Sequence, residues 1–291
     1  MSATQSDPLT AALPTAGGEA TYRVRFRKRK DLIHPPADWD FPRRTIVVTG
    51  MQRAGTNYLC SLIANTGVLG RPTEYFTRGV ALKHDPVRGG DIAVQVTFPN
   101  TVGRTPNGIA AMKLFPFNWD EIAPYVNLFE FYPDPVFVHA SRRDLLGQAI
   151  SFTRALQTGQ WAAANVQQFE PHFSAEAIHE ALMSLVVGEA RLRAYFARNQ
   201  IAPIEVVYED LLGHEADVLG EIARRVGLDE ADCRFDPPAT DLKVQRDDLN
   251  ADWRARFLRE RGDPNRLEIP ALRESRGARL RSALRGLFRP E

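Results

Sequence analysis

The chain has 291 residues and a formal net charge of +1, and 44% of its residues are hydrophobic, which is typical of a globular protein. Near-neutral charge argues against a partner such as nucleic acid, and no apolar run approaches the roughly 20 residues of a membrane-spanning helix. Two cysteines far apart, Cys60 and Cys233, predict neither a disulfide framework nor a zinc cluster, so we expect a cytoplasmic protein without a transmembrane segment.

The N-terminal region carries no regular hydrophobic pattern. Residues 1–20 are rich in Ala, Thr, Pro and Gly and lack the basic-then-apolar order of a secretion signal. We expect a partly disordered lead over residues 1–43, one domain over residues 44–262 and a basic tail over residues 263–291. Residues 273–288 of the tail can be drawn as an amphipathic helix, although its basic residues are also compatible with an ordinary solvated surface.

The first predicted strand is followed by a tight turn. Residues 45–49 form a short β-branched run that predicts a buried strand, and residues 58–64 repeat apolar residues at helical spacing before Gly67. Residues 50–57 therefore turn from strand to helix. Such a turn directs backbone N–H groups and the positive end of the helix dipole to one point, which predicts an anion-binding site.

The turn has nearly the spacing of a phosphate-binding loop. Gly50 and Gly55 occupy the glycine positions of G-x-x-x-x-G-K-[ST], but Thr56 stands at the lysine and Asn57 at the magnesium-binding hydroxyl. A cation, Arg53, lies inside the loop instead. A nucleoside triphosphatase would be handicapped by these changes, whereas a transferase with a phosphosulfate donor needs no metal. An ordinary glycine-containing turn is the alternative.

The rest of the chain alternates predicted strands and helices. This order predicts a mostly parallel sheet with helices on both faces, which binds its ligands at the carboxyl ends of the strands. The six histidines show no metal-site spacing. Residues 76–100 give mixed signals, and we expect a mobile or substrate-covering segment there. The predicted strands are residues 108–115, 135–140 and 203–208, and the predicted helices are residues 119–129, a segment from 145 capped by Asp144, 174–199, and a basic helix at Trp253.

Several stretches of this sequence together resemble one known family. Gln52-Arg53-Ala54-Gly55-Thr56 is similar to the loop that binds the 5′-phosphosulfate in sulfotransferases using 3′-phosphoadenosine 5′-phosphosulfate (PAPS). With Gly70-Arg71-Pro72-Thr73-Glu74-Tyr75-Phe76, residues 101–108 and Lys113, it resembles the bacterial trehalose 2-sulfotransferase family. The resemblance extends over roughly residues 45–260 and implies a P-loop-like sulfotransferase fold.

The resemblance implies roles for the residues around the turn. The backbone from Ala54 to Asn57 would hold the 5′-phosphate, although these two residues replace hydroxyl residues usual in the loop. Arg53 and Lys113 would stabilise charge on the transferred group. Glu74 would be the general base, and without the resemblance it would be an ordinary salt-bridge partner for a neighbouring arginine. Cytosolic steroid and phenol sulfotransferases have a histidine shortly after the lysine, where this chain has Phe115.

Further matches concern the rest of the donor. Arg142, at the end of a predicted strand, and Ser151, on the next helix, match the site for the donor's 3′-phosphate, and an arginine with a hydroxyl suits a phosphate. Tyr208 matches a tyrosine near the adenine. Gln245 and Arg246 belong to a stretch whose counterpart closes over the donor nucleotide.

The sequence therefore predicts a sulfotransferase that moves a sulfuryl group from PAPS to a hydroxyl of a carbohydrate or a glycosylated small molecule, including natural products. No metal is required in this reaction. A P-loop-type kinase of a small molecule and a non-catalytic nucleotide-binding protein remain alternatives. The resemblance also allows a homodimer, and the sequence leaves the identity of the acceptor open.

Overall fold

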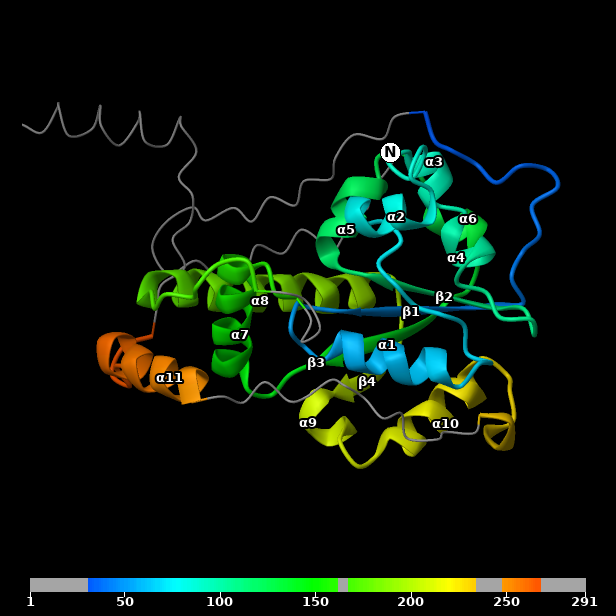
Figure 1. Cartoon of the computed structure of the whole chain (residues 1–291). Helices are drawn as coiled ribbons and strands as arrows, with labels where there is room; N and C mark the ends of the chain where they lie inside the picture. Colours follow the sequence, from blue (N-terminus) through cyan, green and yellow to red (C-terminus); the bar gives the residue numbers. More distant parts are fainter. Residues whose placement is uncertain (1–30, 162–166, 234–247, 268–291) are drawn as a thin grey trace, which may run out of the picture. The chain divides into compact units, whose positions relative to one another are not determined.

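A computed structural model describes residues 31–161, 167–233 and 248–267 (Figure 1). Residues Arg27–Gly262 make up one compact unit, and the elements below belong to it. Within that unit, residues ahead of the first strand pack against later parts of the chain: the Trp39 ring contacts the Phe131 ring edge-on, with 5.2 Å between the ring centres. The predicted tail helix over residues 273–288 lies outside the described residues.

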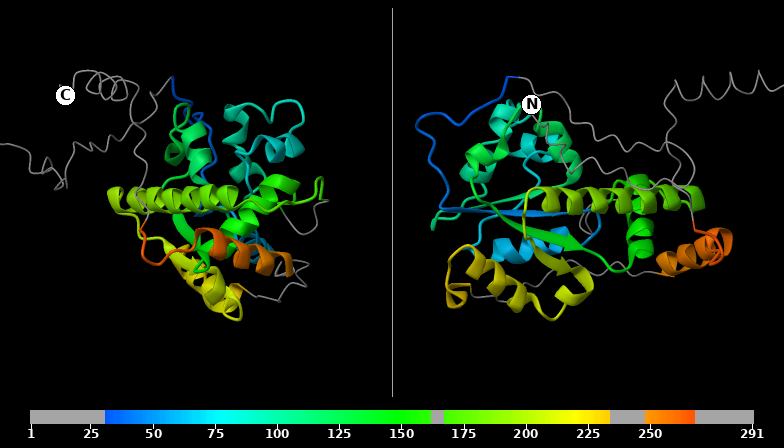
Figure 2. Two further views of the ribbon diagram at one scale, coloured as in Figure 1. Left: turned by 90° about the vertical axis from the view of Figure 1, so that its left-hand side faces the viewer. Right: turned by 180° about the vertical axis from the view of Figure 1, so that it is seen from behind.

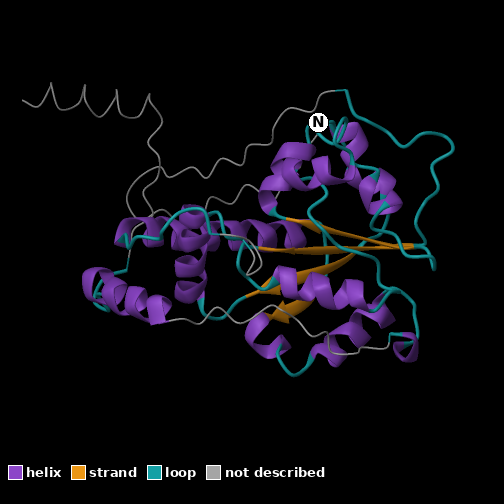
Figure 3. Ribbon diagram, viewed as in Figure 1, coloured by secondary structure: helices purple, strands orange, loops and turns teal. Residues whose placement is uncertain are grey.

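A four-stranded parallel sheet forms the centre of the unit (Figure 3). Helices cover both of its faces, and every residue of the second strand is buried. Strands covered on both faces have continuous apolar runs, which is why these segments could be recognised in the sequence. The predicted fold class is confirmed. The strands are β1 (Arg44–Gly50), β2 (Ile109–Leu114), β3 (Val136–Ser141) and β4 (Ile204–Val207), in the spatial order β2-β1-β3-β4.

The helices divide between two sides of the sheet and one end of it. Helices α1 and α10 bury apolar residues against one face, and α2 to α6, with part of α8, do so against the other. Helices α7, α8 and α11 share a third apolar cluster beyond the carboxyl ends of the strands (Figures 1 and 2). The helices are α1 (Thr56–Asn65), α2 (Arg78–His84), α3 (Ile92–Gln95), α4 (Phe98–Thr101), α5 (Pro116–Ile122), α6 (Leu128–Phe131), α7 (Leu145–Thr158), α8 (Ala175–Arg198), α9 (Tyr208–Leu211), α10 (Glu215–Arg225) and α11 (Asp248–Arg261), with a 3₁₀ turn at Glu230–Asp232.

Two of the three long helices beside the sheet end, α7 and α8, begin with side-chain caps. The Asp144 carboxylate accepts a hydrogen bond from the Gly147 N–H at 3.0 Å, and the Ser174 hydroxyl accepts one from the Ala177 N–H at 3.1 Å. These caps satisfy N–H groups that the helix cannot pair internally, and they confirm the predicted starts of α7 and α8. Across the described part of the chain, α8 included, we find no helix long and apolar enough to cross a membrane.

Two local predictions are wrong. The helix predicted over residues 119–129 is two helices, since α5 ends at Ile122 and α6 begins at Leu128. Pro124 lies between them, and it interrupts the helix because proline has no N–H for the helical hydrogen bond and its ring would clash with the carbonyl four residues earlier. The segment 76–100, expected as a mobile or substrate-covering stretch, folds as α2 and α3 with the start of α4, and it buries apolar side chains such as Val96 and Phe98 in the core.

Candidate active site

The candidate site lies where the chain leaves β1 and β3. From β1 the chain continues to β2 on one side, and from β3 it continues to β4 on the other, so the carboxyl ends of β1 and β3 form a topological switch point, the usual ligand site of such sheets. Gly50 is paired with Ala140 across these ends. A Cβ atom on Gly50 would lie 2.2 Å from the Ala140 carbonyl oxygen, so only glycine fits.

The turn after β1 leads directly into the first helix. Gly55 caps α1 in the left-handed region with φ 83°, and Arg53 also has a positive φ of 64°. A Cβ atom on Gly55 would lie 2.3 Å from the Tyr208 ring, so Tyr208 packs directly against the turn. Gly55 has no side chain with which to cap α1, and the N–H groups of the first turn, which starts with the buried Thr56, lack partners within the helix. This end of α1 can therefore donate to an anion.

Part of the turn is occupied by internal hydrogen bonds. The N–H of Ala54 donates to the Met51 carbonyl at 3.2 Å, so of the backbone donors predicted from Ala54 to Asn57 the first is already used. The Gln52 carbonyl accepts a hydrogen bond at 2.7 Å from the side-chain amide of Gln148, on α7. These contacts fix the path of the turn.

Arg53 joins the turn to α7. Its Nε donates to the Ser151 hydroxyl at 2.8 Å, and its NH1 donates to the Trp161 carbonyl at 2.6 Å. Burial, followed by the charges of Arg142 and Arg154, lowers the pKa of Arg53. The structure thus gathers three guanidinium groups around one helix, and we call Arg53, Arg142 and Arg154 the arginine cluster.

Arg142 extends from the end of β3 toward the same turn. Its NH1 donates to the Arg53 carbonyl at 3.4 Å, and its guanidinium lies 5.5 Å from the centre of the Tyr208 ring. Its Nε is 3.6 Å from the Glu209 carboxylate but makes no hydrogen bond among the described residues. Arg142, Ser151 and Tyr208, which the sequence placed on three separate elements, therefore meet at one end of the sheet.

A second group lies at the end of β2. The Lys113 side chain is only 4% exposed, and its Nζ donates to the Asn57 side-chain oxygen at 2.5 Å and to the Glu74 carboxylate at 2.8 Å. The ammonium also lies 4.8 Å from the centre of the Phe115 ring. Glu74, on the loop before α2, is 28% exposed. A lysine and a carboxylate are thus held beside the first turn of α1, and we call them the Lys113–Glu74 pair.

Some of these contacts had no role in the sequence analysis. Asn57 was given a role only as a backbone donor, although its side-chain oxygen accepts a hydrogen bond from Lys113. Gln148 and Arg154 were not singled out there, although a glutamine on the buried side of a helix could have signalled a backbone contact. Gln245 and Arg246 lie outside the described residues. In the described residues, no group of three His, Cys, Asp or Glu side chains could hold a metal ion.

Comparisons with known proteins identify relatives of this chain. The trehalose 2-sulfotransferase of Mycolicibacterium smegmatis is 28% identical over 265 residues, which are 76% of this chain and 96% of that protein. The trehalose 2-sulfotransferase of Mycobacterium tuberculosis is 28% identical over 271 residues, which are 78% of this chain and 98% of that protein.

One solved structure also resembles the chain, but only loosely. The sulfotransferase domain of the Synechococcus PCC 7002 olefin synthase is 18% identical and covers 90% of this chain and 100% of its own, with a TM-score of 0.38. A superposition this loose adds nothing to the assignment. The model of the family described as Stf0 sulphotransferase matches residues 45–260, from the second residue of β1 almost to the end of α11. Since this match takes in all of the sheet except Arg44 and both groups of the candidate site, the chain belongs to the Stf0 sulphotransferase family.

Proposed function

We propose that this sulfotransferase moves a sulfuryl group from PAPS to a hydroxyl of a carbohydrate or a glycosylated small molecule, with Glu74 as the general base. One observation carries the proposal. Arg53 bonds to Ser151 at 2.8 Å, while Lys113, at the same end of the sheet, bonds to Glu74 at 2.8 Å. Positively charged side chains that suit an anionic sulfuryl donor thus lie around the start of one helix. A carboxylate that could accept the proton of an alcohol lies there as well.

The residues present fit a donor with two anionic groups. The N–H groups of Gly55, Thr56 and Asn57 open the first turn of α1 and suit the 5′-phosphate. Arg142 and Ser151 suit the 3′-phosphate, because an arginine offers forked donors to phosphate oxygens. The buried Nε of Arg142, without a hydrogen bond among the described residues, is a donor that a bound anion would satisfy. Tyr208, packed against Gly55, suits the adenine.

In the transfer step the acceptor oxygen attacks sulfur as the bond from sulfur to the 5′-phosphate oxygen breaks. Glu74 takes the hydroxyl proton, and 3′-phosphoadenosine 5′-phosphate (PAP) leaves. Arg53 and Lys113 stabilise the negative charge on the sulfuryl oxygens and on the bridging oxygen. Preorganised charge of this kind is usually the largest single contribution to catalysis. PAPS supplies the activated sulfuryl group, and the protein supplies the base and the positive charge.

The acceptor is proposed by class. Both curated relatives carry the name trehalose 2-sulfotransferase, which makes trehalose the first compound to test. Acceptor pockets vary on a shared donor site, so other sugars and glycosylated natural products belong in the same assay.

Thermal unfolding with nucleotides tests the proposal. PAP at a hundred times its dissociation constant adds about 2.7 kcal/mol to the free energy of unfolding and raises the melting temperature. ATP with magnesium at the same concentration is expected to raise it less. Stabilisation by ATP with magnesium alone, together with metal-dependent ATP consumption, would identify a kinase. Stabilisation by PAP without transfer from labelled PAPS to any sugar would identify a non-catalytic nucleotide-binding protein.

A further inference from the structure

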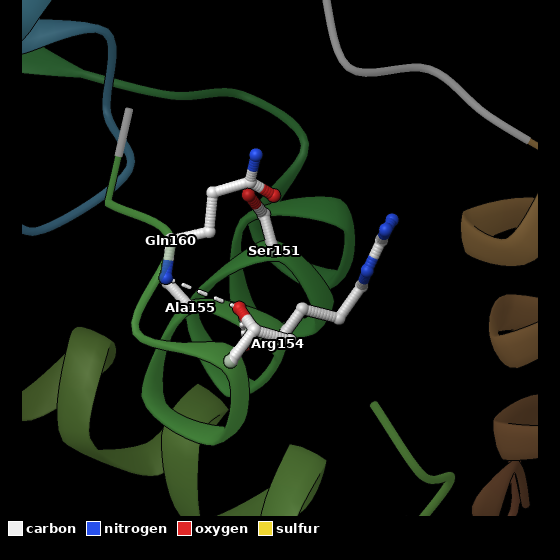
Figure 4. A pocket seen from close by; sticks show the side chains of 5 residues that line it. Ser151, Arg154, Ala155 and Gln160 are labelled. Atoms are coloured by element: carbon white, nitrogen blue, oxygen red, sulfur yellow. Dashed lines mark hydrogen bonds between the residues drawn. The ribbon is translucent and has the colours of Figure 1, made fainter. Parts of the chain in front are cut away.

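Arg154 has no role in the reaction as proposed, yet it lies beside a residue that does. It follows Ser151 by three positions on α7, so the two side chains share one face of the helix. Both line a surface depression whose other members include Thr158 and Gln160 (Figure 4). The depression therefore brings a guanidinium, two hydroxyls and an amide to one place.

The close view shows how these groups are arranged. The Ser151 hydroxyl and the Gln160 amide point toward one another, and Arg154 extends from the same helix on the side of α11 (Figure 4). The Gln160 N–H is bonded to the Thr158 hydroxyl at 3.2 Å, which fixes the chain after α7. NH1 of Arg154 donates to the Asn250 side-chain oxygen on α11 at 2.8 Å. Asn250 thus orients Arg154 and acts as a positioning residue.

The electrostatics of this region point to an anion. Burial and the charges of Arg142 and Arg154 disfavour the charged form of Arg53, as the lowered pKa of Arg53 records. Gathering like charges costs stability unless an opposite charge is present. Glu209 approaches Arg142 at 3.6 Å, and the Nε of Arg53 donates to the Ser151 hydroxyl at 2.8 Å. Three arginines beside a hydroxyl and an amide suit a doubly charged phosphate monoester.

We propose that Arg154, held by Asn250 and flanked by Ser151 and Gln160, binds the 3′-phosphate of the donor nucleotide on its α11 side. This inference rests on the proposed function. It adds a charged residue from α7 to the donor site and makes α11 part of that site through Asn250. The 3′-phosphate would then be held by arginines from two elements, Arg142 at the end of β3 and Arg154 on α7.

The test compares two nucleotides that differ by one phosphate. Dissociation constants for PAP and for adenosine 5′-monophosphate (AMP) are measured by calorimetry on the full chain and on Arg154→Gln. Loss of a charge-assisted hydrogen bond is expected to weaken PAP binding about tenfold to a hundredfold. AMP binding is expected to stay unchanged, because AMP lacks the 3′-phosphate. Arg154→Lys, which keeps the charge without the forked donors, is expected to give a smaller loss confined to PAP.

Arg254→Gln is the matched control. Arg254 also joins α11 to α7, because its NH2 lies 2.5 Å from the Asp144 carboxylate, but it does not line the depression. If loosening of α11 were the cause, both variants would weaken PAP and AMP alike. Equal losses for the two nucleotides in Arg154→Gln, or no loss for PAP, would overturn the inference. A wild-type chain that does not prefer PAP to AMP would instead contradict the proposed function itself.

Discussion

Lys113 Nζ lies 2.8 Å from the Glu74 carboxylate and, on its other side, 2.5 Å from the Asn57 side-chain oxygen. The lysine arrives from β2, Glu74 from the loop before α2 and Asn57 from the first turn of α1. The ion pair therefore fixes Glu74 beside the helix end that is proposed to hold the donor. As the proposed base, Glu74 would in this position act on an acceptor hydroxyl next to the sulfuryl group.

Replacement of Glu74 tests the base. In Glu74→Gln the side chain keeps its size but cannot take a proton, so we expect transfer from PAPS to be abolished while PAP still raises the melting temperature. Activity is measured with labelled PAPS and trehalose. Glu130→Gln changes a carboxylate that bonds to His34, far from the pair in sequence, and should leave transfer unchanged. Unchanged transfer in Glu74→Gln would assign the base to another residue.

Replacement of Arg53 tests charge stabilisation. We expect Arg53→Ala to lower turnover on the order of a hundredfold or more, about 2.7 kcal/mol or above, by analogy with loss of one oxyanion donor. Since Arg53 also bonds to Ser151 and to the Trp161 carbonyl, Ser151→Ala is measured beside it to separate the loss of charge from the loss of that contact. A fall of only a few-fold in Arg53→Ala would remove Arg53 from the mechanism.

Replacement of Gly55 tests the packing of the turn. Gly55→Ala should lower the free energy of unfolding by about 1–3 kcal/mol for the left-handed backbone, with a further loss because the new Cβ meets the Tyr208 ring. Gly67→Ala is the control, since Gly67 has φ 68° but nothing within 4 Å of an added Cβ. Urea unfolding gives both values. An equal decrease in the free energy of unfolding at the two positions would show that the Tyr208 ring moves aside without loss of stability.

A buried histidine gives a prediction about pH. The ring nitrogens of His139 lie 2.7 Å from Glu205 and 3.1 Å from Glu189, and Glu189 is also bonded to Arg193. Burial alone would lower the pKa of His139, but the two carboxylates outweigh it and the pKa is raised. Because both ring nitrogens face carboxylates, the protonated ring can donate to both. The Phe196 ring packs edge-on against it.

The sign of the effect follows from that shift. A group whose pKa is raised in the folded state stabilises that state fully when the pH is below the pKa of the unfolded chain, about 6.5 for histidine. This contribution is lost as the pH rises through the pKa of the folded state. The free energy of unfolding should therefore decline with rising pH above about 6.5, and this decline should be absent in His139→Gln. Urea unfolding at a series of pH values measures it. The same decline in wild type and variant would show that His139 does not carry the dependence.

The strands could be predicted from the sequence because each is a short, nearly continuous apolar run, as β2 and β3 are. Helix α8 could be predicted from its periodicity and from Ser174. The short helices α2 to α4 could not, because four to seven residues are too few to show a period. Pro124 in the sequence indicates a break between α5 and α6, but the predicted helix over residues 119–129 did not take it into account.

The candidate site divides in the same way. Residues in the turn were found because a glycine-rich turn between strand and helix has a recognisable pattern. The bond between Arg53 and Ser151 joins residues 98 positions apart and depends on how α7 packs, which no local pattern records. The contact of the Asn57 side chain with Lys113 and the position of Arg154 beside Ser151 could not be predicted for the same reason.

The close approach of Gly50 to the Ala140 carbonyl has a consequence for ligand choice. Since there is no room for a side chain between them, the ends of β1 and β3 meet through their backbones, and the backbone therefore sets the spacing between the α1 turn and Arg142. A spacing set in this way would select ligands by the length between their two charged ends. Substitutions among the surrounding side chains would then alter how tightly a nucleotide is held, while the geometry of the two strand ends would continue to decide which nucleotides can bridge the site.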